Sequence, residues 1–193
     1  MSEERYCTYT KRLNPNKALK QNSATAIEWY ALRILHNKSS EVCSIALRDN
    51  IEHFTPMRTT ERVVDGRTVV SMRPIMPSLL FVRCTTEYIS LLATRTNSNV
   101  IAYCTPGTSK PQPIPDSEME LFRFVTRTAS REIELLPNDV ELGDRVRITG
   151  GIFSGVEGYI HRIHGTKRLV VAIEGISVVA TTYIPKQYIQ KIV

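Results

Sequence analysis

Hydrophobic and polar residues follow two different patterns along this chain. Up to about residue 127, short β-type runs alternate with segments whose apolar side chains recur at helical spacing. After residue 140 only short, β-branched runs remain, and glycines separate them. The first pattern predicts an α+β domain and the second predicts a small all-β domain.

The first domain is predicted to follow the order β-α-β-β-α-β-α. Its clearest turn is Asp65-Gly66 between two valine-rich runs, because these residues tolerate the positive φ angles of a type I′ hairpin. Ser39 and Ser40 suit the start of a helix, and Asn50 suits its end. The order predicts a split βαβ arrangement, which is an antiparallel sheet with helices mainly on one face.

Residues 73–82 are a short apolar run between prolines, too brief for an ordinary helix. Read as a strand, the run places Leu79 and Phe81 on one face and apolar neighbours on the other. One interpretation is a central strand covered on both sides. The other is that Leu79 and Phe81 form an apolar patch for a partner protein. Helices on one face of the sheet favour the second interpretation.

The second domain shows five short strand patterns in about fifty residues, which are too few for an open sheet with a useful core. Closure into a small five-stranded, SH3-like β-barrel is therefore expected. The strands are predicted at residues 145–149, 156–163, 169–173, 178–182 and 188–192. The density of β-branched residues around Gly175 predicts that 170–182 stays β rather than helical.

These patterns divide the 193 residues into four parts. Residues 1–26 are expected to be a flexible basic tail, since they contain almost no large aliphatic side chains. The α+β domain is expected at 27–127, a linker at 128–140 and the β-barrel at 141–193.

The charge, the apolar runs and the cysteines of the sequence limit the classes of function that we expect. The net charge of +6 permits nucleic-acid contact. No apolar run has membrane-spanning length and no signal peptide is evident, so we expect a cytoplasmic protein without membrane contact. The cysteines are scattered, which argues against a zinc site and for reduced thiols. They are Cys7, Cys43, Cys84 and Cys104.

No pattern of catalysis is visible. The histidines show no metal-ligand spacing, and neither a nucleophile motif nor a phosphate loop occurs. We therefore expect no enzyme, no metal and no cofactor. A ribosome-associated or RNA-binding protein remains an alternative, because Arg162, Lys167 and Arg168 lie near predicted barrel turns.

Two segments carry a family resemblance. GDRVRITGGIFSGVEG at 143–158 resembles a KOW motif. Trp29-Tyr30 and PIMPSLLFV at 74–82 are similar to the NGN domain of the NusG family. The phrases FTPM at 54–57 and LLFV at 79–82 resemble the UpxY-type specialised paralogs, which are RfaH-like in role. The resemblance implies a monomeric transcription elongation and antitermination factor for long operons, typically for surface polysaccharide.

The resemblance also implies sites. The NGN sheet face would bind the clamp helices of RNA polymerase through Arg33, Phe54, Met76, Leu79 and Phe81. A second polymerase contact would use Ser90, Leu91 and Leu92. The KOW loop Gly151-Ile152-Phe153 corresponds to the loop that meets Rho or a ribosomal protein in general NusG proteins.

A separate hypothesis, based on the residues alone, concerns DNA binding by the predicted hairpin. Alternating arginines on a protruding ribbon suit the backbone of upstream or non-template DNA. A merely soluble hairpin is the competing interpretation. The arginines are Arg58, Arg62, Arg67 and Arg73.

Overall fold

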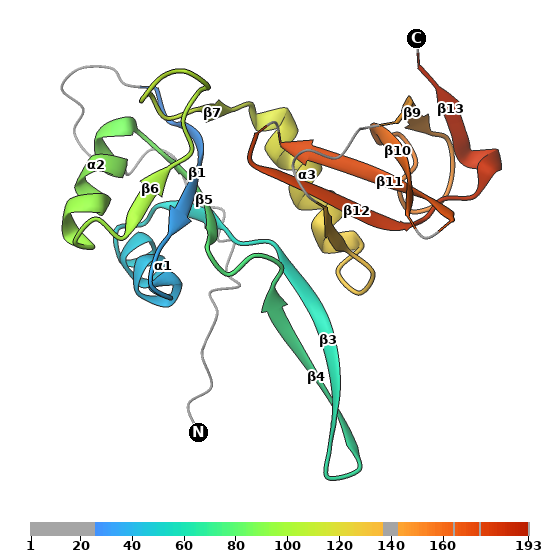
Figure 1. Ribbon diagram of the computed structural model, residues 1–193, viewed down its shortest axis with the longest axis horizontal. Coiled ribbons are helices and arrows are strands. Elements are labelled where there is room, and N and C mark those ends of the chain that lie inside the picture. Colours follow the sequence, from blue (N-terminus) through green and yellow to red (C-terminus); the bar gives the residue numbers. More distant parts are fainter. Residues whose placement is uncertain (1–25, 137–142, 164, 174, 193) are drawn as a thin grey trace. The chain divides into compact units, whose positions relative to one another are not determined.

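The computed structural model describes residues 26–136, 143–163, 165–173 and 175–192 (Figure 1). Most of the predicted tail and residues 137–140 of the predicted linker lie outside the described residues. The chain forms two compact units. One contains residues 26–55 together with Met76–Asp116, and the other contains Pro56–Ile75 together with the described residues from Ser117 onward.

The first unit is built on an antiparallel sheet in which β5 (Leu79–Cys84) lies between β2 (Glu52–Phe54) and β1 (Glu28–Ile34). On its other edge β1 pairs with β6 (Val100–Ala102) and with β7 (Pro113–Ile114). Two helices complete the unit, α1 (Ser39–Arg48) and α2 (Thr86–Arg95).

One face of this sheet packs against both helices. Leu80 and Val82 of β5 share a buried cluster with Val42 of α1 and with Ile89 and Leu92 of α2. The apolar residues of each helix recur at three- and four-residue spacing, so one stripe of each helix faces the sheet. The prediction of helices on this face is confirmed.

The opposite face of β5 is buried as well, so the predicted exposed patch is wrong. Leu79 is 1% exposed and Phe81 is 0% exposed. Phe81 lies opposite Ala31 on one side and Phe54 on the other, and both neighbours are buried. The ring centroids of Phe54 and Phe81 are 6.3 Å apart. Because Leu80 and Val82 are buried on the other face, β5 is buried on both faces, and such a strand is apolar at consecutive positions.

The run 73–82 is not a single strand. Pro74 ends β4 (Arg67–Pro74), and β5 begins only at Leu79. Pro74 and Pro77 have no N–H to donate to a ladder, so the chain turns between them. The Leu79 N–H donates to Met76 O at 3.1 Å and closes this turn.

The ends of the helices differ in detail from the expected caps. Lys38 is the N-cap of α1 without a side-chain hydrogen bond, and Ser39 Oγ donates to Pro77 O instead. Thr85 caps α2 by accepting from the Tyr88 N–H at 3.3 Å. Asn50 follows α1 with φ of 62°, as its place at the helix end predicted.

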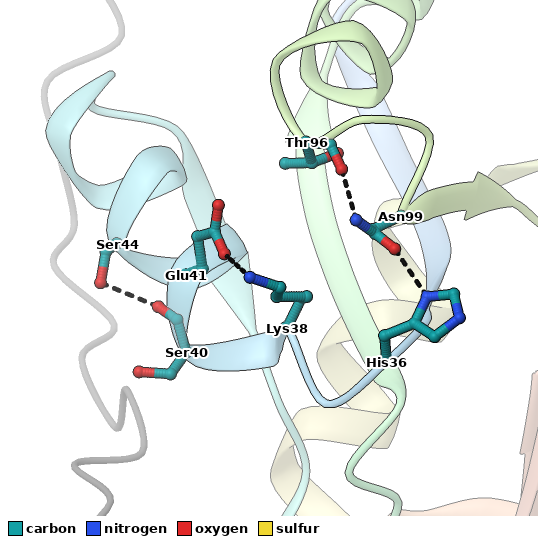
Figure 2. A network of polar contacts seen from close by, with 7 residues as sticks. All are labelled: His36, Lys38, Ser40, Glu41, Ser44, Thr96 and Asn99. Carbon is teal, nitrogen blue, oxygen red and sulfur yellow. Dashed lines mark hydrogen bonds and ion pairs between the residues drawn. The ribbon is translucent and has the colours of Figure 1, made fainter.

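A polar network fixes the loops at one end of the first sheet (Figure 2). His36 Nδ1 lies 2.7 Å from Asn99 Oδ1, an arrangement in which the ring N–H donates. The Asn99 side-chain amide donates to Thr96 O at 2.6 Å. The Leu35 N–H also donates to Asn99 O at 2.9 Å. Asn99 therefore joins the end of β1 to the start of β6.

The second unit contains a two-stranded ribbon of β3 (Met57–Val64) and β4, helix α3 (Asp116–Thr128) and a six-stranded sheet. The ribbon turns at Asp65 and Gly66, with φ of 50° and 74°, which confirms the predicted hairpin. Helix α3 buries Met119, Phe122 and Val125, which recur at three-residue spacing. Thr59 N–H donates to Ser130 O at 2.8 Å and ties the ribbon to the chain after α3.

The six-stranded sheet contains the five predicted C-terminal strands in the order β13-β9-β10-β11-β12, followed by β8. Its core comes from alternating residues such as Val146, Ile148, Leu169 and Val171, all buried. A 3₁₀ turn, Lys186–Tyr188, precedes the last strand. The strands are β8 (Glu134–Leu136), β9 (Arg145–Ile148), β10 (Glu157–Ile163), β11 (Thr166–Ile173), β12 (Ser177–Tyr183) and β13 (Ile189–Lys191).

Strand β8 lies inside the segment expected to be a linker. It pairs with β12, and Glu134 accepts a hydrogen bond from Arg168 at 2.9 Å. Part of this segment therefore belongs to the C-terminal sheet. Among the described residues the longest helix is α3, with 13 residues, and no helix there is both long and apolar enough to cross a membrane.

Candidate functional sites

The five residues expected to bind polymerase differ in exposure. They come from strands β1, β2 and β5 and from the turn before β5, all within the first unit. Arg33 is exposed and Met76 is partly exposed, whereas Phe54, Leu79 and Phe81 are buried. Arg33 lies directly opposite Leu79 on the same sheet face. Only Arg33 and Met76 therefore offer an accessible surface in this conformation.

Ile101 is a candidate that sequence reasoning missed. It lies on β6 directly opposite Arg33, on the same sheet face, and is 50% exposed. An isoleucine at the centre of a three-residue strand gives no periodic signal of its own. The accessible part of this face therefore combines a cation, Arg33, with an apolar side chain, Ile101. We call these two residues, together with Met76 in the turn before β5, the sheet rim.

The three residues of the second expected polymerase contact lie on different sides of helix α2. Ser90 and Leu91 lie on the exposed side of α2, and Leu91 is 50% exposed. Leu92 is fully buried in the cluster beneath the helices, so its expected role as a contact is wrong. Consecutive helix residues are rotated by about 100°, and Leu92 falls on the stripe that faces the sheet.

The KOW loop also has one accessible and one buried side chain. Ile152 is 67% exposed, whereas Phe153 is 2% exposed. The Phe153 ring meets Phe124 of α3 edge to face, with centroids 6.2 Å apart. Gly151 has φ of 78° and permits the tight loop. Ile152 is therefore the apolar side chain that this loop presents to solvent.

The ribbon brings its four arginines to one face. Directly opposed residues of an antiparallel pair share a face, and the ladder pairs Arg58 with Arg73, Arg62 with Val69 and Val64 with Arg67. Positions 58, 62, 67 and 73 then all point the same way, because residues two apart along a strand do so. All four arginines are exposed. We call this surface the arginine face.

Perturbed ionisable groups in the first unit have structural explanations. Asp49 has a lowered pKa because Arg95 donates to its carboxylate and, more weakly, because Tyr88 Oη donates at 2.8 Å. Burial raises the pKa of Cys84 to about 12. Burial and the hydrogen bond to Glu28 raise the pKa of Tyr30 to about 12. Within the described residues, no three His, Cys, Asp or Glu side chains are placed to hold a metal ion.

Comparison with known proteins identifies the class. The family model described as "Transcription termination factor nusG" matches residues 27–123, just over half of the chain. The chain therefore belongs to the NusG family of non-enzymatic transcription factors, which bind RNA polymerase. The match covers the sheet, both of its helices and the ribbon.

The other comparisons add little. The chain is similar to a solved structure described as "Crystal Structure of MjSpt4:Spt5 complex conformation B", with 16% identity over 85% of this chain and 96% of that chain. The TM-score is 0.25, which is too low to indicate a shared overall structure. No curated protein sequence matches the chain.

Proposed function

We propose that this protein binds the clamp helices of RNA polymerase and promotes processive, antiterminated transcription of long operons, in particular surface-polysaccharide operons. The family match carries the polymerase part of this proposal. The operon part rests on the similarity of residues 54–57 and 79–82 to the UpxY-type paralogs. Mapping the chromosomal sites at which the protein crosslinks tests it, and occupancy spread evenly over all transcribed genes would contradict it.

The sheet rim is the proposed polymerase contact. Arg33 supplies charge, and Ile101 supplies apolar surface directly opposite it on the sheet. Met76, in the turn before β5, supplies further apolar surface that is partly exposed. Phe54, Leu79 and Phe81 lie buried on the same face, and we assign them the role of holding the rim strands in register. An apolar side chain beside a cation is a common composition at the centre of a protein interface.

A co-purification experiment tests the rim. The variants Arg33→Glu and Ile101→Asp should each reduce recovery of core polymerase at least tenfold while the protein stays folded. Leu47→Asp is the matched control, because Leu47 is 52% exposed on α1 whereas Ile101 is 50% exposed on β6. Equal recovery with all three variants would contradict the assignment. Sedimentation with ribosomal subunits instead of polymerase would favour the RNA-binding alternative.

We further propose two roles outside the rim. Ser90 and Leu91 form a second polymerase contact on the exposed side of α2. The C-terminal strands close into a KOW barrel whose loop presents Ile152 to a ribosomal protein or Rho. The pairing of β13 with β9 supports closure, since it brings the last of the five strands back beside the first. Ile152→Asp should abolish binding of that partner and leave polymerase recovery unchanged.

The domain division follows from the same proposal. We take residues 27–127 as the NGN domain, 128–140 as the linker and 141–193 as the KOW domain. Strand β8, residues 134–136 of the linker, pairs with β12 of the KOW sheet.

A further inference from the structure

The arginine face of the ribbon has an unusual charge pattern. Its eight positions on β3 and β4 hold four arginines, two hydroxyl residues and two valines, with no carboxylate: Arg58, Thr60, Arg62, Val64, Arg67, Val69, Ser71 and Arg73. The opposite face holds Glu61 and no basic residue of the two strands. The ribbon therefore separates its positive charge onto one side.

Arg58 and Arg73 are the sharpest feature of this face. They lie directly opposite each other in the ladder. Like charges in opposed positions of an antiparallel pair destabilise it. No ion pair involves either arginine within the described residues, and neither faces a carboxylate on its own side of the ribbon. An anion held between the two guanidinium groups would remove this repulsion.

The remaining positions continue the same chemistry along the ribbon. Thr60 and Ser71 occupy the next rung, where their hydroxyl oxygens lie 2.9 Å apart. Arg62 and Arg67 occupy the two rungs beyond. At roughly 3.4 Å per residue, the four rungs span about 20 Å. This length corresponds to about six nucleotide steps of a stacked strand, at roughly 3.4 Å of axial rise each.

We propose that the arginine face binds the phosphate backbone of a nucleic acid lengthwise, with Arg58 and Arg73 sharing one phosphate. Guanidinium groups bind phosphate oxygens in a bidentate fashion. The face holds no aromatic side chain on which a base could stack, so binding is independent of base sequence. The site does not depend on polymerase, so the protein alone suffices to test it.

Salt dependence measures the phosphates contacted. Binding of the full-length protein to a fluorescent 20-nucleotide single strand, to the corresponding duplex and to an RNA of the same sequence is followed from low to moderate salt. Each phosphate lost lowers the slope of log K against log salt by about one. Arg62→Gln with Arg67→Gln should lower the slope by about two. Arg58→Gln with Arg73→Gln should lower it by about one, because those two arginines share a phosphate.

The control variant removes the same charge elsewhere. Arg48 and Lys110 are exposed in the first unit, and Arg48→Gln with Lys110→Gln should leave the slope unchanged. Equal slopes for the control and both ribbon variants would overturn the proposal. If replacing Arg58 and Arg73 together lowers the slope by two, each arginine contacts its own phosphate and the shared phosphate is wrong. Equally tight binding of polyglutamate would show a site for acidic protein and would also overturn it. Among single-stranded DNA, duplex DNA and RNA, the one that binds with the highest affinity is the form that the arginine face prefers.

Thermal unfolding of the free protein gives an independent reading. Arg58→Gln or Arg73→Gln alone should raise Tm at low salt, because each removes the opposed repulsion, and the gain should vanish at high salt. A lowered Tm for both variants would mean that the arginines stabilise the free ribbon, which contradicts the shared site.

Discussion

Arg33 and Leu79 lie directly opposite each other on β1 and β5, yet Arg33 is exposed and Leu79 is 1% exposed. The boundary between buried and accessible surface on this sheet face therefore runs between two paired residues. On the buried side, Phe81 has no exposed surface. On the accessible side, Ile101 is half exposed. Replacing a residue on the buried side should lower the stability of the protein. Replacing one on the accessible side should leave stability nearly unchanged and weaken binding of polymerase.

Phe81→Ala should destabilise the protein by about 3–5 kcal/mol, as expected for removing a buried phenylalanine from a packed core. The ring meets Phe54 at 6.3 Å between centroids, so the loss leaves a cavity beside a second aromatic side chain. Urea unfolding measures the change. Ile101→Ala is the control, and it should cost less than about 1 kcal/mol because half of its side chain is already in water. Similar losses for the two variants would contradict the burial boundary.

The sequence predicted local structure better than it predicted burial. The Asp65-Gly66 turn and the strands on either side follow from residue types that a type I′ hairpin strongly favours. Leu79 and Phe81 show the limit, because an apolar residue is equally suited to a buried face and to an interface. Which faces become covered depends on contacts between distant segments, and these are not encoded in any short window of sequence.

Two smaller elements show the same limit. Strand β8 contains three residues and begins with Glu134, so it lacks the length and alternation of a recognisable strand. It forms because β12 offers a free edge and Arg168 pairs with Glu134 at 2.9 Å. Ile101 was missed as a site residue for a similar reason, since its exposure depends on the position of β6 at an edge of the sheet.

Asp49→Asn should destabilise the protein at neutral pH and not at low pH. Arg95 and Tyr88 donate to the Asp49 carboxylate, and these hydrogen bonds stabilise its charged form. They hold the pKa of Asp49 below its unfolded value of about 3.9. The contribution is therefore complete above that value and is lost as the pH falls through the lower, folded pKa.

Chemical denaturation at a series of pH values measures this difference between the wild-type protein and Asp49→Asn. The two stability curves should be separated at pH 7 and should converge in strong acid. Glu41→Gln is the control, because Glu41 pairs with Lys38 at an exposed site and should cost at most about 0.5 kcal/mol. A separation that does not depend on pH would show that Asp49 acts through packing rather than charge.

Thiol labelling should distinguish the cysteines. Cys104 is exposed, whereas Cys43 and Cys84 are buried. Burial also raises the pKa of Cys84 to about 12, so almost no thiolate is present at neutral pH. In a Cys7→Ser background, a disulfide reagent should label one thiol rapidly and the other two only in denaturant. Adding Cys104→Ser should remove the fast phase, and persistence of that phase would mean that the first unit opens readily.

Gly175→Ala tests whether the C-terminal sheet keeps its β structure. Strands β11 and β12 flank the turn at Gly175, whose φ is 70°. Alanine in this left-handed conformation costs roughly 1–2 kcal/mol, so the variant should be less stable. A helix through this segment would respond in the opposite direction, because alanine is about 1 kcal/mol better than glycine inside a helix.

The sign of the stability change therefore separates a permanent sheet from a segment that refolds into a helix. Gly165→Ala is the matched control, since Gly165 has φ of 80° in the neighbouring turn between β10 and β11. Both variants should lose stability by similar amounts. Carbon chemical shifts of the full-length protein give the direct measurement, with β values expected on both sides of Gly175. Helical shifts anywhere in 168–182, or a gain in stability from Gly175→Ala, would contradict a permanent β structure.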